Sequence, residues 1–150
     1  RDKGKTSAPT NALKAIAMGH ANNKCIPFEM PYNGRENYHF VEDIGMYFAA
    51  STLQDYKGFG AFNVKGKTIG IEEFLKIVED EASELGIAEF VKLSIAEGAE
   101  PNLFVSDLSH KKIDSTFNEL PLTSISEGVR RSLIEFIEMA KQGNLNYSVN

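Results

Sequence analysis

The stretch NYHFVEDIGMYFAAS, residues 37–51, places two acidic residues ahead of a run that has no charged side chain from Ile44 to Leu53. Glu42 and Asp43 lie where the positive end of a helix dipole favours carboxylates, so the stretch predicts a helix that begins close to them. Apolar residues occupy most faces of this helix, and such a helix has to be covered on more than one side. We therefore expect a large surface to pack against it.

Helices alternate with short strands along the rest of the chain, which predicts an α/β fold. Helical spacing of apolar residues predicts further helices at 9–18, 70–86, 107–113 and 120–143. Short apolar runs beside turn residues predict strands at 25–30, 38–40, 61–66 and 90–95. Gly19 is expected to end the first helix, and Ser124 with Glu127 has the spacing of a capping box for the last one.

Composition narrows the class of protein. The 150 residues are 42% hydrophobic, which suits one compact domain, and the formal net charge of −5 without clustered Lys or Arg argues against nucleic-acid binding. No apolar run approaches the roughly 20 residues of a membrane span. A single cysteine, Cys25, excludes an internal disulfide, so we expect a cytoplasmic protein. The chain starts at Arg1 without a methionine or a leader pattern, so we expect a piece of a longer protein.

Read alone, the sequence motifs predict no catalytic centre or metal site. The tripeptide at 66–68 spells the end of a phosphate-binding P-loop, yet Ala61 stands where that loop requires a glycine. The three histidines lack metal-ligand spacing, and Asp43 is interpreted as a helix-terminus charge rather than a catalytic carboxylate. Arg35 follows an Asn-Gly turn, where it can lie in water or hold a phosphate or carboxylate, and the residues leave both readings open.

Four stretches, in order, resemble the C-terminal part of an extended short-chain dehydrogenase/reductase of the NAD-dependent epimerase/dehydratase family. They are RDKGKTSAPT at 1–10, NYHFVEDIGMYFAAS at 37–51, GFGAFNVKGKTIGIEEF at 58–74, and VSDLSHKKIDSTFNELPLTSISEGVRRSLIEF at 105–136. The family patterns that they resemble are an Arg-containing loop, a Val-(Asp/Glu)-Asp helix start, a Tyr/Phe-Asn-Val strand, and an Asp-x-Ser-Lys helix followed by a proline turn and a Glu-Gly helix. The ordered set is more specific than any one piece.

The resemblance implies one substrate-binding segment over residues 1–150, with four to five helices and short strands but without most of the Rossmann sheet. The missing N-terminal dinucleotide-binding domain would hold NAD or NADP and the catalytic Tyr-x-x-x-Lys pair, and it would pack on the helix at 44–53. The parent protein is thus expected to be an NAD(P)-dependent enzyme, while this segment alone binds no cofactor and carries no catalytic residue. Family members often form homodimers through helices upstream of this segment.

For this segment the resemblance implies recognition of a small-molecule substrate, a sugar or something similar to a nucleotide sugar. The expected substrate-binding residues are Arg1, Thr6, Ser7, Tyr32 and Arg35. The first three would border the pocket, and the other two would approach the far end of the substrate, where nucleotide-sugar members place an arginine on the diphosphate. Glu36, rather than Arg35, takes the position that matches this arginine. The alternative is a stand-alone module that binds a small molecule or a protein and has no catalytic activity.

Overall fold

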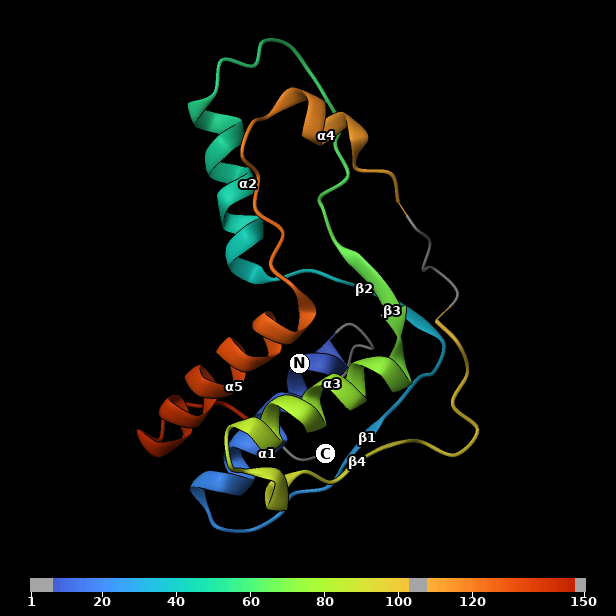
Figure 1. Ribbon diagram of the computed structural model, residues 1–150, viewed down its shortest axis with the longest axis vertical. Helices are drawn as coiled ribbons and strands as arrows, with labels where there is room; N and C mark the ends of the chain where they lie inside the picture. Colours follow the sequence, from blue (N-terminus) through green and yellow to red (C-terminus); the bar gives the residue numbers. More distant parts are fainter. Residues whose placement is uncertain (1–6, 103–107, 148–150) are drawn as a thin grey trace.

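The structure is a computed structural model that describes residues 7–102 and 108–147. This part of the chain contains five α-helices and four short strands, which confirms the predicted α/β class. In chain order the elements are α1 Ala8–Ala21, β1 Phe28–Met30, β2 Arg35–Tyr38, α2 Val41–Leu53, β3 Lys67–Gly70, α3 Ile71–Glu84, the 3₁₀ helix η2 Ala88–Phe90, β4 Leu93–Ile95, α4 Lys111–Thr116 and α5 Ile125–Lys141 (Figure 1).

The four strands form two separate pairs. β1 runs parallel to β4, with Phe28 opposite Leu93, and β2 runs antiparallel to β3, with Arg35 opposite Gly70. Neither pair extends into a larger sheet within the described residues. The helices therefore supply most of the packing surface of the fold.

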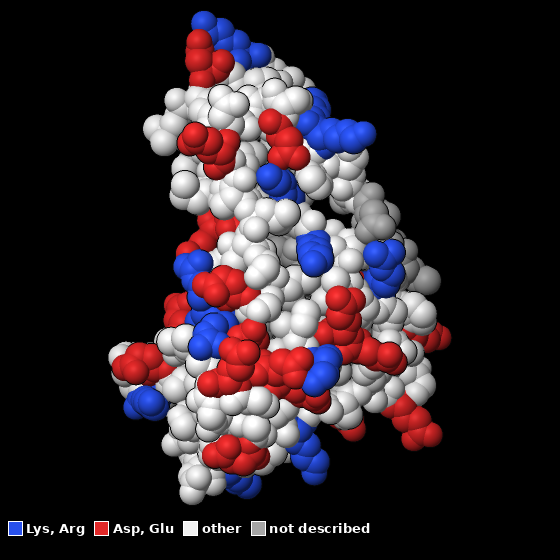
Figure 2. All heavy atoms as spheres, in the orientation of Figure 1, with Lys and Arg blue, Asp and Glu red and all other residues white. Residues whose placement is uncertain are grey.

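Helices α1, α3 and α5 pack together and enclose the main hydrophobic cluster (Figure 1). Its most deeply buried members include Ile16, Met30, Tyr32, Ile71, Val78 and Leu133. α3 turns its apolar stripe inward, and the acidic side chains of its other faces gather on the surface over this helix (Figure 2). The helix predicted at 70–86 is therefore present, with one apolar face in the core and its charged faces toward water.

Helices α2 and α4 lie at the other end of the molecule, around a smaller cluster formed by Tyr47, Ile113 and Phe117 (Figure 1). This cluster covers one face of α2. On its other faces Phe48 is 70% exposed and Leu53 is 84% exposed. Within the described chain, α2 therefore packs against other residues on one face, although its sequence predicts packing on more than one.

Two sequence predictions are wrong for reasons of tertiary structure. Gly19 does not end α1, because the helix continues to Ala21 and Gly19 lies inside it. A Cβ atom on Gly19 would come within 2.9 Å of the Lys24 carbonyl oxygen, so close backbone approach explains this glycine. The segment 61–66 is not a strand, since no described strand lies beside it, and pairing with β2 begins instead at Lys67.

Five further elements have boundaries that differ from the predictions. The strand expected at 25–30 is β1 at Phe28–Met30, and the helix expected at 120–143 is α5 at Ile125–Lys141. The strand expected at 38–40 lies at Arg35–Tyr38, and the one expected at 90–95 is shortened to Leu93–Ile95 because η2 takes up its start. The short helix expected at 107–113 is α4 at Lys111–Thr116. Ser124 caps α5 as predicted, because its Oγ accepts a hydrogen bond of 3.1 Å from the backbone N–H of Glu127.

Candidate ligand-binding site

A cavity of about 370 Å³ lies where the N-terminal ends of α1 and α5 approach the end of β2 and the start of α3. Its described lining consists of Pro9, Thr10 and Leu13 from α1, the continuous segment 36–40, Phe74 from α3, and Thr123, Ser124, Ile125, Gly128, Val129 and Ser132 at and before the start of α5. Small-molecule sites typically measure about 300–1,000 Å³, so this cavity suits a small ligand. Apolar side chains alternate with hydroxyl and amide groups around it.

Aromatic rings form much of the apolar lining. Tyr38 stacks on Phe74 with 4.5 Å between the ring centroids and 11° between the ring planes. Phe40 lies against Gly128, where a Cβ atom would come within 3.2 Å of the ring, and the guanidinium of Arg131 lies 4.8 Å from its centroid. The glycine therefore lets Phe40 pack closely on α5.

Glu36 places a carboxylate at the cavity. Its oxygens accept hydrogen bonds from the side-chain amide of Asn102 at 2.8 Å and the backbone N–H of Asn37 at 3.2 Å. Burial raises the pKa of Tyr38 above its usual range, and the nearby Tyr32 and Glu36 raise it further. The buried hydroxyl of Tyr38 has no hydrogen-bond partner among the described residues. The site thus combines a carboxylate with a phenol that stays protonated at neutral pH.

His39 lies at the same cavity with a fixed ring orientation. Its Nδ1 is 2.8 Å from the carbonyl oxygen of Lys65, and because a carbonyl can only accept, Nδ1 is assigned as the donor. Gly66 makes this packing possible, since a Cβ atom there would come within 2.5 Å of the His39 ring and 2.1 Å of the Asn37 side chain. In the neutral imidazole, Nε2 is then left as an acceptor.

The structure brings the five predicted substrate-binding residues together only in part. Ser7 directly precedes α1 and leads to Pro9 at the cavity, while Arg1 and Thr6 lie outside the described residues. Tyr32 is 0% exposed and belongs to the main hydrophobic cluster. Arg35 is exposed, and its Nη2 donates to the Thr68 carbonyl oxygen at 3.4 Å. Neither of these two lines the cavity, and a substrate role for all five stays a prediction.

Sequence reasoning missed three cavity residues, Glu36, Tyr38 and His39. The sequence predicts a turn and then a short strand here, with Tyr32 and Arg35 as the binding residues, so it does not single out these three. One signal was present, because Glu36 stands where the resembled family places a ligand-binding arginine. The part of the cavity lining that comes from α5 could not be predicted from the sequence, since the first turn of α5 is more than 80 residues from β2.

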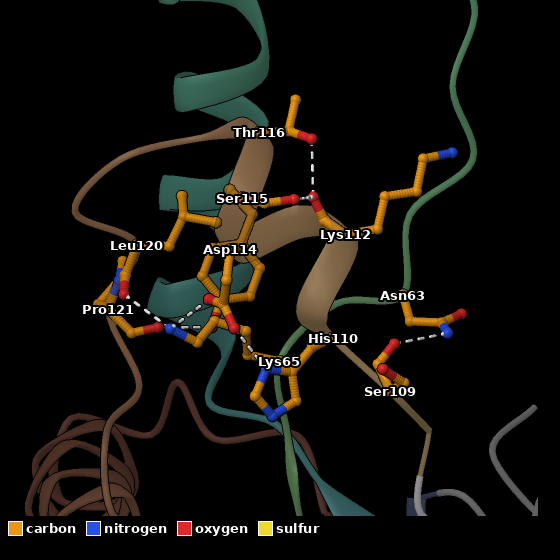
Figure 3. A network of polar contacts seen from close by, with 11 residues as sticks. Asn63, Lys65, Ser109, His110, Lys112, Asp114, Ser115, Thr116, Leu120 and Pro121 are labelled. Carbon is orange, nitrogen blue, oxygen red and sulfur yellow. Dashed lines mark hydrogen bonds and ion pairs between the residues drawn. The ribbon is translucent and has the colours of Figure 1, made fainter.

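A second polar cluster joins α4 to segment 61–66 and to the loop before α5 (Figure 3). Asp114 lies 2.9 Å from Lys65 Nζ and 2.7 Å from His110 Nδ1, and the hydrogen bonds from Lys65 and His110 hold the pKa of Asp114 below its usual range. Lys65 also donates to the Leu120 carbonyl oxygen at 3.3 Å. No cysteine lies in this cluster and its hydroxyls donate to backbone carbonyls, so we interpret it as a clamp between segments.

The buried carboxylate of Asp43 holds α2 in the same region. It accepts hydrogen bonds from the backbone N–H and the hydroxyl of Thr123, at 2.7 and 2.8 Å. Asp43 does lie in the first turn of α2, as the sequence predicted, but its partner is the loop that leads into α5. Asp43 therefore positions part of the cavity lining, because Thr123 belongs to it.

In the part of the chain that the structure describes, no group of three His, Cys, Asp or Glu side chains is placed to hold a metal ion. Over the same residues, no helix has both the length and the apolar character needed to cross a membrane. Comparison with known proteins finds no matching family model and no similar curated protein or solved structure.

Proposed function

We propose that this chain is the substrate-recognition portion of a cytoplasmic NAD(P)-dependent epimerase/dehydratase, whose cofactor-binding domain packs on α2 and on segment 61–66. The observation that carries the proposal is that, within residues 7–102 and 108–147, these two neighbouring parts of the chain both lack the packing partners that their sequences require. The redox chemistry would come from NAD or NADP and from the Tyr-x-x-x-Lys pair of that other domain. The residues described above would bind and orient the substrate.

The exposed apolar residues of α2 support the proposal that a partner domain packs on this helix. Val41, Met46, Phe48 and Leu53 are all exposed, and Phe59 in the following loop is 97% exposed. Contiguous apolar patches larger than a few hundred Å² are rare on monomeric proteins and usually mark an interaction site.

The features of segment 61–66 favour a partner domain that contains a β-sheet. Its sequence favours a strand, but it has no strand neighbour among the described residues. Side chains instead reach two of its carbonyl oxygens, with Lys112 Nζ 3.0 Å from that of Ala61 and His39 Nδ1 2.8 Å from that of Lys65. An extended segment with unpaired backbone groups is suited to join the edge of another sheet.

The cavity supports a role in substrate recognition. Its lining includes Pro9 and Thr10, at the end of the stretch 1–10 that the family resemblance assigns to the substrate pocket. Its hydroxyl, amide and aromatic groups suit a small polar molecule such as a sugar. Two such subunits would pair as a homodimer through the cofactor-binding part, as the resemblance implies.

The first test is the intact mass and N-terminal sequence of the protein as its own cell produces it. A product of about twice this mass, with a glycine-rich strand-turn-helix ahead of Arg1, would support the proposal. A product that begins at Arg1 would overturn it and would leave the stand-alone binding module.

The second test is hydrogen exchange of the backbone amides of α2 and segment 61–66, measured in the natural protein and in residues 1–150 expressed separately. We expect both regions to exchange much more slowly in the natural protein, because the partner domain covers them. The helix α3 serves as the control and should exchange equally in both samples. Equal exchange of α2 in both samples would contradict the proposed docking.

A further inference from the structure

The cavity beside β2 carries a negative charge that no described side chain neutralises. Glu36 is the only Asp, Glu, Lys or Arg residue among its described lining residues. The ion pairs of the described chain all involve other carboxylates. The donors that face Glu36 are neutral: the amides of Asn37 and Asn102, and the hydroxyl of Tyr32, whose pKa is raised by burial and by Glu36. A carboxylate offers about four acceptor positions, so Glu36 can take further donors.

The aromatic lining adds to this electron-rich character. The rings of Tyr38, Phe40 and Phe74 line the cavity, and the faces of aromatic rings attract cations. Arg131 shows this attraction, because its guanidinium lies 4.8 Å from the centroid of Phe40 and occupies one face of that ring. The buried Tyr38 hydroxyl has no partner in the described chain, so its oxygen is another open acceptor.

The two helix N-termini at the cavity are each compensated in part. At the start of α5, the Ser124 Oγ accepts a hydrogen bond from the Glu127 N–H, and Glu127 adds a carboxylate in the first turn. At the start of α1, Pro9 lacks one of the N–H groups that could face an anion. Among the described lining residues, no Lys or Arg offsets the repulsion that an incoming phosphate would meet at the Glu36 carboxylate.

From these features we infer that the cavity binds a small polyhydroxylated amine in its protonated form, with the ammonium group paired to Glu36 and the aromatic rings. The hydroxyls of Thr10, Thr123 and Ser132 would serve the neutral part of the ligand. This inference deepens the proposed function and rests on it for the interpretation of the cavity as a substrate site. It names a cationic ligand at this position.

The test compares three probes of similar size on ¹⁵N-labelled protein by NMR titration at neutral pH. D-Glucosamine carries an ammonium group there, D-glucose is neutral and D-glucose 6-phosphate is anionic. We expect glucosamine to shift the amide signals of residues 36–40 and Gly128 and to bind at least about tenfold more tightly than glucose, as suits a charge-assisted hydrogen bond. Glucose 6-phosphate should bind most weakly.

Two variants with the same change of charge locate the effect. Glu36→Gln should remove the preference for glucosamine over glucose, whereas Glu29→Gln, an exposed position on β1 outside the cavity, should keep it. The three-probe comparison on the unmodified protein stands even if Glu36→Gln fails to fold. Equal binding of glucosamine and glucose, or tighter binding of glucose 6-phosphate, would overturn the inference.

A result in which none of the probes shifts these signals would also overturn it. The docking of the cofactor domain is judged separately, by the natural N-terminus and by hydrogen exchange of α2. The failure of this inference is therefore distinguishable from the failure of the proposed function.

Discussion

Asp43→Asn tests how α2 is fixed to the loop that lines the cavity. Asp43 is 5% exposed, and its two oxygens accept hydrogen bonds from the backbone N–H and the hydroxyl of Thr123. Asparagine has nearly the same shape but replaces one acceptor oxygen with an NH₂ group. The variant therefore loses a charge-assisted hydrogen bond and places two donors against each other.

The expected cost follows from these contacts. A hydrogen bond to a charged group contributes about 1.5–3 kcal/mol, and a buried donor that is left without a partner costs about 1–3 kcal/mol. Because these two contributions overlap, we expect the free energy of unfolding to fall by about 2–3 kcal/mol. For a protein of this size, that corresponds to a decrease in Tm of about 4–12 °C.

Urea unfolding followed by circular dichroism measures the change, with Asp55→Asn as the matched control. The Asp55 side chain is 84% exposed and lies 3.6 Å from the equally exposed Lys57, so its replacement should change the free energy of unfolding by less than about 0.5 kcal/mol. A double-mutant cycle with Thr123→Val then measures the coupling between the two side chains. If Asp43→Asn costs no more than Asp55→Asn, these hydrogen bonds do not hold α2 in place.

The remaining predictions concern two helical glycines and one tyrosine. Gly45→Ala should raise the free energy of unfolding of the separate chain by about 0.5–1 kcal/mol, because Gly45 lies inside α2 and an added Cβ meets no atom within 4 Å. Gly19→Ala should lower the free energy of unfolding, because its Cβ would come too close to the Lys24 carbonyl oxygen. Urea unfolding of both variants checks the two signs, and a stable Gly19→Ala would contradict the close approach. Burial, and then the charges of nearby carboxylates, raise the pKa of Tyr47 to about 12. The free energy of unfolding should therefore fall by up to about 1.4 kcal/mol per pH unit as the pH rises from about 10 to 12. Tyr47→Phe should lose less stability over this range in alkaline unfolding measurements, and an equal slope would refute the assignment.

The sequence by itself determined the features that depend on local interactions. Apolar spacing identified α3 and α5, and the capping box at Ser124 marks the observed start of α5 inside the predicted helix 120–143, because a cap acts within one turn of helix. The same logic identified α2, and its lack of charge indicated a helix that needs more cover than the described chain supplies. Fold class followed from the alternation of such segments.

Only the tertiary structure decided what depends on contacts between distant segments. Segment 61–66 has the sequence of a strand, but a strand forms only where a partner offers hydrogen bonds, so its state depends on its neighbours. Gly19 has the sequence signal of a helix end, yet the approach of Lys24 gives it a different role. The cavity arises in the same way, because β2 and the first turn of α5 meet only after α1, α3 and α5 pack together. Local patterns fix which elements form, whereas the site depends on how those elements meet in space.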